Sequence, residues 1–521
     1  MKVCILAAGV GQQLNSFSET LGEALLPISN TTALSIILNK FPSDSEFIIA
    51  IGHKADLVKS YCEAVHDDLN ITFVDVENYE SSGSGPGYSL LQCRPYLDDK
   101  FYLTTVDCLY DEDLPEIIDT DWIGVAHTLH PNKYATLKTD NNNKVVEFIN
   151  RSRLGYPLAF IGLAFIYSYE LFWNQLEKYR NKENLIEFVS AWYEPNLFNN
   201  LLAIHLTWND TDSIENYNHT LSKYGSPNLG MDKIITEHTF LQNNTIVKIS
   251  LDKNKNLKRI KRAEQLKNLI PKIKYKSDNV IAYSWVDGEE MYFHEHNLLI
   301  NRLLNYLKDN LWKKVVVYDF NKICYSFYHD KTFQRYGKIN YINDEYCVIN
   351  GLKCKPVINL LSKINFDMLS YGSPVRIHGD LQFQNIIVNK DDFTLIDWRE
   401  DFAGLTECGD LFYDLAKLYA CLQLDYSKIR EISKSIEFKN DNNFTFKNID
   451  NNNLKESSRI FERFILENQI DIDLDKIKIL SALIWLNMSP LHKYPDNLLL
   501  FLYSKYYLNS IFYSNRYFQI D

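Results

Sequence analysis

The segment from Arg376 to Glu400 carries two acids and an amide in an order that suits phosphoryl transfer. In RIHGDLQFQNIIVNKDDFTLIDWRE, Asp380 follows a His-Gly pair, Asn385 comes five residues later, and Asp397 ends an apolar run. Transfer of a phosphoryl group from ATP needs one carboxylate that orients or deprotonates the attacking hydroxyl. It also needs an amide oxygen and a second carboxylate that hold Mg²⁺ against the phosphates. A short hairpin between Asn385 and Asp397 would bring both predicted metal ligands to one end of the site.

A second pattern, at the start of the chain, is of a kind that binds phosphate. LAAGVGQQL places Gly9 and Gly11 directly after an apolar run. Glycines at the end of a strand let backbone N–H groups approach a triphosphate closely. A glycine pair alone is weak evidence, so its meaning depends on the motifs that follow it.

The elements that position the glycine pair alternate regularly. From Met1 to about Tyr217, amphipathic stretches separate short runs rich in β-branched and aromatic residues, namely KVCILAAG, EFIIAIG, ITFVDV, FYLTTVD and DWIGVAHTL. Residues 33–40 and 55–64 have the pattern of helices. This alternation predicts an α/β domain with a mostly parallel sheet and crossover helices.

The string KYGSPNLGM at 223–231 interrupts this pattern, and we place a domain boundary there, giving domains 1–222 and 223–521. Beyond it, NTIVKIS and NVIAYSWVD are typical of strands, on either side of a Lys/Arg-rich helix at about 255–270. From about residue 370 the pattern is helical, apart from two short strands near Ile387 and Leu395. An antiparallel sheet followed by a helical lobe is an α+β arrangement.

Composition narrows the class of protein. The 521 residues carry a formal net charge of −12, which argues against a broad basic surface for nucleic acid. No apolar run reaches the roughly 18 residues that span a bilayer. The nine cysteines include no CxxC pair, which favours reduced, mostly buried thiols and argues against a zinc site. We therefore expect a cytoplasmic protein without a membrane span or a nucleic-acid partner.

The HGDL…N…IDW string resembles the signature of the choline kinase and aminoglycoside phosphotransferase family, relatives of protein kinases. GDLFYDLAKL, residues 409–418, is similar to the segment that follows in bacterial members. The resemblance implies an α+β protein-kinase-like domain that uses ATP and Mg²⁺. It assigns Asp380 as the catalytic base and Asn385 and Asp397 as the Mg²⁺ ligands.

The same resemblance implies a strand lysine that binds the ATP phosphates. Lys248 stands inside the apolar NTIVKIS, where a charge is costly unless it is paired. Glu264, in KRAEQLKNL, is the predicted partner. The alternative is an edge-strand lysine that points to solvent, and no glycine-rich loop precedes Lys248.

In the first 220 residues, LAAGVGQQL is followed in order by ALLPI, GSGPGYSLL, TTVD and TWNDTDSIENY. This series resembles the sugar-phosphate nucleotidyltransferases, including the bacterial choline-phosphate cytidylyltransferases, and implies a Rossmann-like fold. By resemblance, Gly9 and Gly11 cradle a triphosphate, Gly85 lies in the turn that faces the base, and Arg151 meets the acceptor phosphate. Asp107 and Asp210 match the pair that holds Mg²⁺ between the NTP and the incoming phosphate, where a cation neutralises the gathered charge.

Two positions depart from that family's pattern. Gln13 stands where the family has an arginine, and Glu23 stands where it has a lysine. Both lost cations would contact the triphosphate. The N-terminal domain is therefore an active nucleotidyltransferase with altered phosphate contacts, a degenerate domain that still binds a nucleotide, or a structural platform for the kinase.

Together the two resemblances imply a bifunctional enzyme. A kinase would convert a small alcohol (a sugar, polyol or amino alcohol) into a phosphate ester, and a nucleotidyltransferase would couple that ester to an NTP, with CTP slightly favoured. The resemblance assigns the product to bacterial surface glycans such as capsule. The alternatives are a kinase with an inactive N-terminal domain and a nucleotide-sensing or scaffold protein. Self-association to a homo-oligomer is left open.

Overall fold

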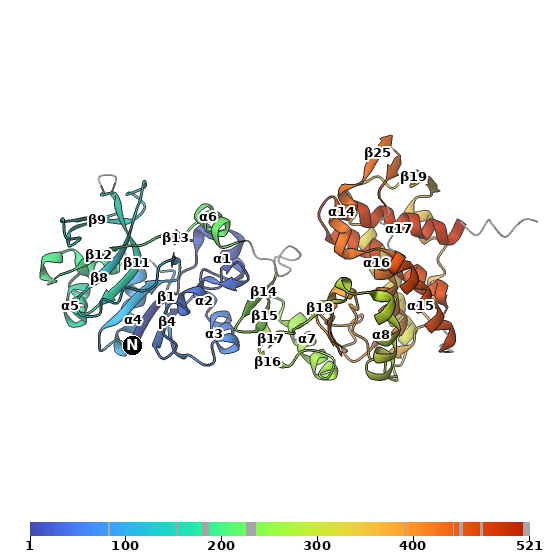
Figure 1. The fold of residues 1–521 in the computed structure, drawn as a ribbon, viewed down its shortest axis with the longest axis horizontal. Coiled ribbons are helices and arrows are strands. Elements are labelled where there is room, and N and C mark those ends of the chain that lie inside the picture. Colours follow the sequence, from blue (N-terminus) through green and yellow to red (C-terminus); the bar gives the residue numbers. More distant parts are fainter. Residues whose placement is uncertain are drawn as a thin grey trace, which may run out of the picture. The chain divides into compact units, whose positions relative to one another are not determined.

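The computed structural model describes residues 1–81, 84–152, 155–179, 187–198, 200–225, 236–390, 392–440, 442–447, 452–468 and 473–513. The chain forms two compact units (Figure 1). The first unit comprises residues 1–253 and 274–283, and the second comprises residues 254–273 and 284–521.

Among the described residues of the first unit, nine strands form one mixed sheet. In spatial order they are β10 (Val145–Asn150), β9 (Ala135–Thr139), β11 (Leu158–Ile166), β6 (Phe101–Thr105), β1 (Lys2–Ala7), β4 (Glu46–Ile51) and β5 (Asn70–Asp75), with β8 (Trp122–His127) on β11 and β12 (Leu202–His205) on β8. Strands β5, β4, β1 and β6 run parallel, whereas β11 is antiparallel to β6, β8 and β9. β1 is almost entirely buried, as a central parallel strand covered on both faces must be.

Helices connect and cover this sheet. They are α1 (Ser16–Thr20), α2 (Ala33–Leu38), α3 (Ala55–Val65), α4 (Pro86–Cys93), α5 (Tyr169–Tyr179) and α6 (Ile214–Tyr224). Small ladders pair β2 (Pro27–Ile28) with β3 (Thr31–Thr32), and β7 (Cys108–Tyr110) with β13 (Trp208–Asp210). Ser213 caps α6 by accepting a hydrogen bond from the backbone N–H of Asn216, and the helix ends before Gly225, whose φ of +89° favours glycine.

A smaller sheet completes the first unit, with the order β14 (Glu237–Gln242), β15 (Thr245–Ser250), β17 (Val280–Ser284) and β16 (Ile273–Lys276). Phe240, Val247 and Ile249 on this sheet are fully buried in the same apolar core as Tyr61 of α3. The rings of Phe240 and Tyr61 meet edge to face at 5.7 Å. This packing groups residues 236–253 with the first unit, whereas the sequence places the boundary at 222/223. The predicted boundary string lies largely outside the described residues.

The second unit combines small ladders with many helices. The ladders are β18 (Glu289–Glu290) with β22 (Ile386–Asn389) and β23 (Asp392–Leu395), β20 (Leu352–Cys354) with β19 (Cys347–Ile349), β26 (Asn443–Thr445) and β25 (Glu437–Asn440), and β21 (Pro374–Val375) with β24 (Gly409–Asp410). The helices are α7 (Lys253–Leu266), α8 (His296–Asn310), α9 (Phe320–Tyr325), α10 (Lys331–Tyr336), α11 (Val357–Leu361), α12 (Phe366–Leu369), α13 (Leu411–Gln423), α14 (Ile429–Lys434), α15 (Asn452–Glu467), α16 (Leu474–Met488) and α17 (Asp496–Tyr513). A π-helical turn, Ser326–Asp330, joins α9 to α10.

Most predicted elements are confirmed. The five apolar runs of the first domain form β1, β4, β5, β6 and β8, and the two predicted helices form α2 and α3. The antiparallel strands beside β6 were not foreseen, because an apolar run carries no information on strand direction. Helices of the second unit also begin well before residue 370, with α8.

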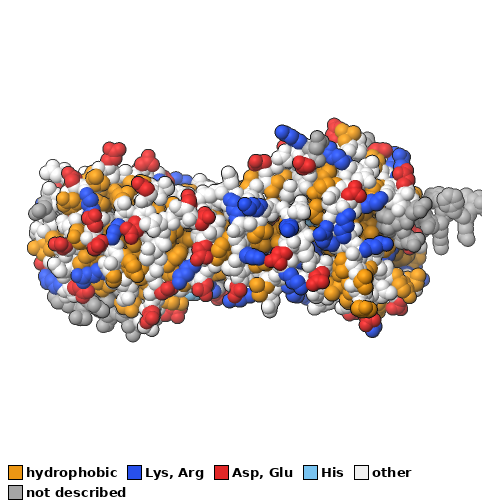
Figure 2. All heavy atoms as spheres, turned by 90° about the horizontal axis from the view of Figure 1, so that it is seen from below, with side chains coloured by type: hydrophobic (Ala, Val, Ile, Leu, Met, Phe, Trp, Pro, Cys, Tyr) orange, Lys and Arg blue, Asp and Glu red, His pale blue; other side chains and the backbone are white. Residues whose placement is uncertain are grey.

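Three further observations concern the cysteines, the apolar character of the helices and the charges on one face. All nine cysteines are described, and each is buried and free of a disulfide. Within the described ranges, no helix combines the length and the apolar character that crossing a bilayer requires. On the face in Figure 2, acidic and basic side chains are interspersed with apolar ones.

Candidate active sites

The loops after β1 and β6 meet at one edge of the large sheet. β1 pairs in parallel with β4 on one side and with β6 on the other, so the strand order reverses beside β1. Ligands of open α/β sheets bind at the carboxyl ends of the strands at such a reversal. The glycine loop with Gly9 and Gly11 follows β1, and Asp107 follows β6. The topology therefore brings these predicted site residues to one place.

Asp210 reaches the same edge through the β7–β13 ladder. In this ladder Asp210 is the Cα partner of Cys108, the neighbour of Asp107, and the backbone N–H of Thr211 donates to the carbonyl oxygen of Asp107 at 3.3 Å. Two acids that lie far apart in the sequence thus stand side by side. The predicted pair Asp107 and Asp210 is brought together.

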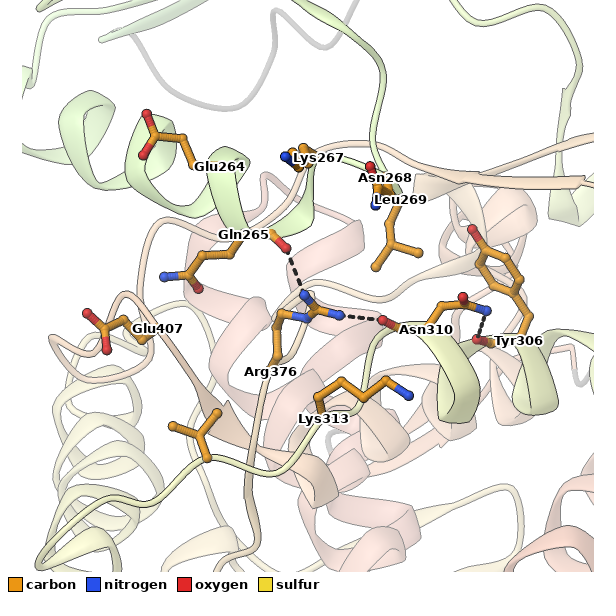
Figure 3. Close-up of a pocket in the computed structure, with 11 residues that line it drawn as sticks. Glu264, Gln265, Lys267, Asn268, Leu269, Tyr306, Asn310, Lys313, Arg376 and Glu407 are labelled. Atoms are coloured by element: carbon orange, nitrogen blue, oxygen red, sulfur yellow. Dashed lines mark hydrogen bonds between the residues drawn. The ribbon is translucent and has the colours of Figure 1, made fainter.

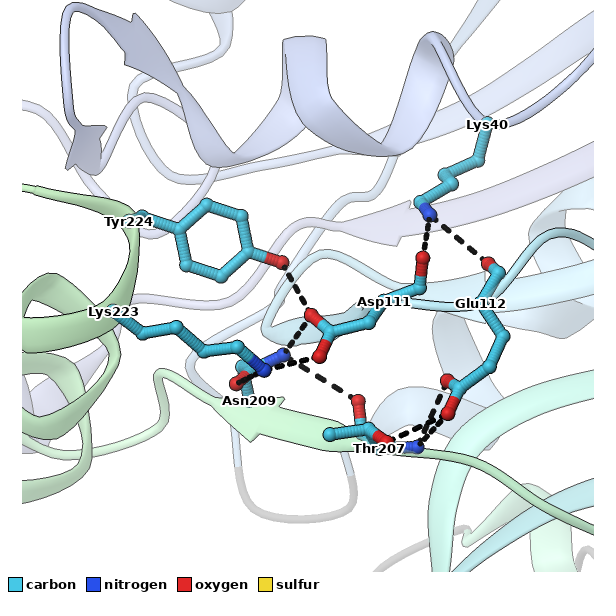
Figure 4. A network of polar contacts seen from close by, with 7 residues as sticks. All are labelled: Lys40, Asp111, Glu112, Thr207, Asn209, Lys223 and Tyr224. Atoms are coloured by element: carbon cyan, nitrogen blue, oxygen red, sulfur yellow. Dashed lines mark hydrogen bonds and ion pairs between the residues drawn. The ribbon is translucent and has the colours of Figure 1, made fainter.

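A polar network holds this ladder in place (Figure 4). Asn209 Nδ2 donates to Asp111 Oδ1 at 2.9 Å, and the Thr207 hydroxyl donates to Glu112 Oε1 at 2.6 Å. Lys223 forms an ion pair with Asp111, and Lys40 Nζ donates to the carbonyl oxygens of Asp111 and Glu112 at 2.8 and 3.0 Å. Because these contacts join β7, β13, α2 and α6, they fix the acids that flank the ladder.

The Asp210 carboxylate is surrounded by donors and by other acids. Tyr134 Oη and Asn216 Nδ2 each donate to Asp210 Oδ2 at 2.9 Å, and the backbone N–H of Asp212 donates to Oδ1 at 3.0 Å. Burial and repulsion from Asp107 raise the pKa of Asp210 to about 8. Burial also raises the pKa of Asp107. The two predicted metal ligands therefore repel each other, and a bound cation would relieve that repulsion.

Glu23 fills the glycine loop. A Cβ atom built on Gly9 would lie 2.8 Å from Glu23 Oε2, and one built on Gly11 would lie 2.6 Å from Glu23 Cγ. Gly11 also has a φ of +69°, which favours glycine. Burial, followed by repulsion from Asp107, raises the pKa of Glu23 to about 8. An acid therefore occupies the loop in which the resemblance places the triphosphate.

The two remaining predicted residues of this site lie on the surface or at a helix start. Gly85 precedes α4 in extended backbone, with a φ of −176°. Arg151 has a φ of +43°, and 60% of its side chain is exposed. Its guanidinium forms an ion pair with Glu187 at 3.3 Å. Arg151 is thus tethered to an acid in this structure.

The second unit builds its site around Asp380. Lys417 Nζ of α13 lies 2.7 Å from Asp380 Oδ1, and Gln382 Nε2 donates to the same oxygen at 2.8 Å. Lys417 is buried, whereas a third of the Asp380 side chain is exposed. Burial alone would raise the pKa of Asp380, but the ion pair with Lys417 outweighs it and lowers the pKa to about 2. Asp380 is therefore an ionised carboxylate with one accessible side.

Buried groups hold the backbone before Asp380. Asp414 accepts hydrogen bonds from the backbone N–H groups of His378 and Gly379, each at 2.8 Å, and from Trp312 Nε1 at 3.2 Å. Arg262 of α7 donates to the carbonyl oxygens of Ile377 and His378. His378 is fully buried, and burial lowers its pKa to about 4, which suits a neutral ring that supports the loop.

Asn385 and Asp397 flank the β22–β23 hairpin, as predicted. Asn385 Nδ2 donates to the carbonyl oxygen of Asp380 at 2.8 Å and to its Oδ2 at 3.3 Å, which leaves the amide oxygen to accept. The backbone N–H of Ile396 donates to the carbonyl oxygen of Asn385 at 2.9 Å, beside Asp397. Asp397 has a φ of +58°, a sparsely populated conformation that often occurs at functional sites.

The donor atoms of the predicted Mg²⁺ ligands can be compared with the ligands that Mg²⁺ prefers. In the part of the chain that the structure describes, no three His, Cys, Asp or Glu side chains are arranged to hold a metal by themselves. Asp107 with Asp210, and Asn385 with Asp397, supply only oxygen donors. Mg²⁺ takes one or two protein oxygens and completes its shell with phosphate and water. Both donor sets therefore fit Mg²⁺ that binds together with a nucleotide.

Lys248 and Glu264 fall in different units. Lys248 lies on β15 opposite Thr239, in the first unit, and Glu264 lies on α7 in the second. Their pairing stays a prediction. Glu264 lines a cavity of about 560 Å³ that lies wholly in the second unit (Figure 3). Arg376 crosses this cavity and donates to the backbone carbonyl oxygens of Gln265, Leu311 and Asn310.

Sequence reasoning missed several residues of both sites. It identified neither Lys417 and Asp414, which hold the Asp380 loop, nor Tyr134 and Asn216, which bind Asp210. The lysine inside the apolar stretch GDLFYDLAKL was an available signal, because a buried charge needs a partner. Glu23 was recognised as a departure, but its position inside the glycine loop was not.

No protein-family model matches the chain. The chain is 25% identical over 218 residues to the bifunctional protein GlmU of Methanococcus aeolicus, which covers 40% of this chain and 51% of that protein. It is 29% identical over 120 residues to the bifunctional IPC transferase and DIPP synthase of Archaeoglobus fulgidus, 22% of each chain. The chain thus spans about half, or less, of the length of these relatives.

Solved structures also resemble part of the chain. The inositol-1-phosphate CTP transferase from T. maritima has a TM-score of 0.35 at 14% identity and covers 43% of this chain and 95% of its own. The CTP:phosphocholine cytidylyltransferase from Streptococcus pneumoniae has a TM-score of 0.36 at 17% identity and covers 42% and 96%. The curated relatives support a nucleotidyltransferase-like N-terminal domain, and hence a transferase. The kinase-like domain stays a prediction.

Proposed function

We propose that this chain is a bifunctional, Mg²⁺-dependent cytoplasmic enzyme. Its second unit phosphorylates a small hydroxylated molecule with ATP, and its first unit couples the resulting phosphate ester to an NTP. An activated group of this kind serves the assembly of bacterial surface glycans, the destination that the resemblance implies.

The arrangement around Asp380 carries the kinase half. The acceptor hydroxyl attacks the γ-phosphorus of ATP, the bond from that phosphorus to the β,γ-bridging oxygen breaks, and ADP leaves. The hydroxyl proton passes to Asp380, which Lys417 and Gln382 hold ionised and in place. Mg²⁺, held by Asn385 and Asp397, would neutralise the charge of the phosphates. Lys248 is proposed to bind the ATP phosphates, with Glu264 as its partner.

The pair Asp107 and Asp210 supports the nucleotidyltransferase half. An oxygen of the ester phosphate attacks the α-phosphorus of the NTP, the bond to the α,β-bridging oxygen breaks, and pyrophosphate leaves. Gly9 and Gly11 would bring backbone N–H groups to the triphosphate, Gly85 would face the base, and Arg151 would exchange Glu187 for the ester phosphate. Mg²⁺ between the two acids would offset the charge that gathers there.

A second candidate function has an observation of its own. Because Glu23 lies against Gly9 and Gly11, a triphosphate entering the loop meets an acid where the resembling family has a lysine. This favours a kinase whose N-terminal domain only binds a nucleotide or serves as a scaffold.

The test uses the full chain with Mg²⁺. ADP release is measured with ATP and a panel of sugars, polyols and amino alcohols, and pyrophosphate release is measured with their phosphate esters and CTP, UTP, dTTP, GTP or ATP. We expect ADP release that Asp380→Asn abolishes and pyrophosphate release, best with CTP, that Asp107→Ala abolishes. ADP release without pyrophosphate release from any NTP would establish the second candidate instead.

A further inference from the structure

Four cationic side chains around the loop that carries Asp380 lie near enough to repel one another, and the kinase proposal uses only one of them. We call this group the cation cluster: Lys331 and Arg335 of α10, Arg399 after β23, and Lys417 of α13. The helix that carries Lys331 begins directly after a π-helical turn, a feature that is frequent at functional sites.

The ring of Phe327 joins two members of the cluster. Lys331 Nζ lies 4.0 Å from the centre of this ring, and Arg399 Cζ lies 5.3 Å from it. Phe402 stacks on Phe327 at 4.1 Å and Tyr413 meets it edge to face at 4.9 Å, so the ring is fixed. Two cations are therefore held near each other on a rigid support.

Arg399 ties the cluster to the catalytic loop. Its backbone N–H donates to the carbonyl oxygen of His378 at 3.1 Å, and its Nε donates to that of Asp401 at 2.9 Å. Its stem lies so close to Gly379 that a Cβ atom there would be 2.7 Å from Arg399 Cβ. The Arg399 side chain therefore packs against the loop that carries Asp380.

Three members of the cluster have no described acid at ion-pair distance, although Glu400, Asp380 and Asp401 lie near enough to raise the pKa of Arg399. Asp380 is paired with Lys417, and Asp401 is paired with Lys258 at 2.7 Å. Among the described residues, no carboxylate lies within ion-pair distance of the three cations that remain, Lys331, Arg335 and Arg399. Burial, together with repulsion from Arg399, Lys417 and Arg335, lowers the pKa of Lys331 well below its usual range, although the nearby Glu400 opposes this shift. Repulsion among like charges raises the free energy of the folded protein, and a bound anion would lower it.

We propose that the cation cluster binds an anionic group, a carboxylate or a phosphate, on the alcohol that the kinase phosphorylates. The inference rests on the proposed kinase function and narrows its substrate class to hydroxy acids, acidic sugars or sugar phosphates. Amino alcohols such as choline are poor substrates on this view. The Mg²⁺ that accompanies the phosphates of ATP is assigned to Asn385 and Asp397 beside the hairpin, whereas the cluster comes from α10, α13 and the segment after β23. The acceptor hydroxyl must reach Asp380, so the molecule that carries it lies beside these cations.

The test compares matched alcohols with the full chain, ATP and Mg²⁺, with ADP release as the readout. The pairs are glycerol with glycerate, ethanolamine with glycolate, and glucose with glucuronate and with glucose 6-phosphate, so that carboxylate and phosphate are distinguished. We expect kcat/KM at least about tenfold higher for the anionic member of a pair, the size of one well-placed charge contact.

Variants assign the effect to the cluster. Lys331→Met and Arg335→Met should each raise KM for the anionic acceptor by about tenfold and leave KM for ATP within about twofold. Lys331→Arg should retain the preference, and Lys331→Glu should reduce or invert it. Lys338→Met, which removes an exposed lysine just after α10, is the matched control and should change neither constant.

The outcomes separate the inference from the function on which it rests. Turnover that ignores acceptor charge, or a Lys331→Met variant that raises KM for ATP instead, overturns the inference and leaves the kinase. Absence of Asp380-dependent turnover with every acceptor overturns both. An anionic preference that is lost in Lys331→Met supports both.

Discussion

The acids of the two candidate sites stand in opposite electrostatic environments. In the second unit Asp380 has a buried cation as its partner, and its pKa is held at about 2. In the first unit Glu23 and Asp210 have pKa values of about 8, and no described Lys or Arg forms an ion pair with Asp107, Asp210 or Glu23. Asp380 thus has its counter-ion before any substrate arrives, whereas these three acids of the first unit have none among the described residues. This contrast agrees with the proposed roles, in which the Asp380 site would act on a hydroxyl and the Asp107–Asp210 site would take up metal together with phosphate.

The largest effect should come from Asp380, the acid that has a buried counter-ion. Asp380→Asn keeps the shape of the side chain but removes the proton acceptor, so kcat for ADP release should fall by about 10²–10⁴-fold. Pyrophosphate release from a supplied phosphate ester should not change, and it serves as the internal control. Undiminished ADP release would refute the assignment of the base.

Removal of Lys417, the partner of Asp380, should break the charge balance of the site in the second unit. Lys417→Met leaves Asp380 without a counter-ion and should cost roughly 2–4 kcal/mol of stability, less than for a fully buried pair because Asp380 is a third exposed. Calorimetry of the full chain would detect the loss, and Lys417→Arg should restore much of it. An unchanged melting temperature would mean that the pair contributes nothing to the fold.

At the first site, removal of an acid should instead stabilise the protein, and more so at high pH. The pKa of Glu23 is raised from 4.5 to about 8, so the folded state keeps a proton that the unfolded state loses as pH rises between these values. Stability is therefore lost from about pH 4.5 up to about pH 8. Glu23→Gln removes that loss and should gain on the order of 2 kcal/mol at pH 9 but little at pH 4. A pH-independent difference in melting temperature would contradict this account.

Replacement of the same acid by a cation should make the two sites more alike. Glu23→Lys restores the charge that the resembling family carries and should tighten NTP binding about tenfold, measured by calorimetric titration with CTP and Mg²⁺. Glu19→Lys, the same charge change at an exposed position of α1, is the matched control. Equal gains from both variants would assign the effect to net charge rather than to the loop.

The smallest change in stability is expected at the exposed edge of the first site. Arg151 is 60% exposed in its ion pair with Glu187, whose side chain is 14% exposed, so Arg151→Ala should shift the melting temperature by only about 1–2 °C. If Arg151 meets the acceptor phosphate, KM for the phosphate ester should nevertheless rise about tenfold while KM for the NTP stays the same. A KM that does not change would remove Arg151 from the site.

The residues of the two candidate sites could be predicted from the sequence to different extents. Asp380, Asn385 and Asp397 lie in one short string, so their loop and hairpin could be inferred from local spacing, and the structure puts them around one turn and one ladder. Asp107 and Asp210 could be matched only through a resemblance, because the β7–β13 ladder that joins them has no local signal. The apolar stretch around Lys417 signals that this lysine needs a partner but does not say which one. The other members of the cation cluster could not be located, because helix packing alone brings α10 and α13 to the catalytic loop.

The sequence by itself determined the elements and the local chemistry of this protein: the apolar runs that become strands, the glycine loop after β1, and the acids at the ends of their strands. These follow from side-chain periodicity and from spacing along the chain. Only the tertiary structure decided the charge state of each acid and the groups that surround it. Burial and contacts between distant segments set a pKa, so Lys417 holds Asp380 ionised, while burial and the neighbouring acids keep a proton on Glu23 near neutral pH.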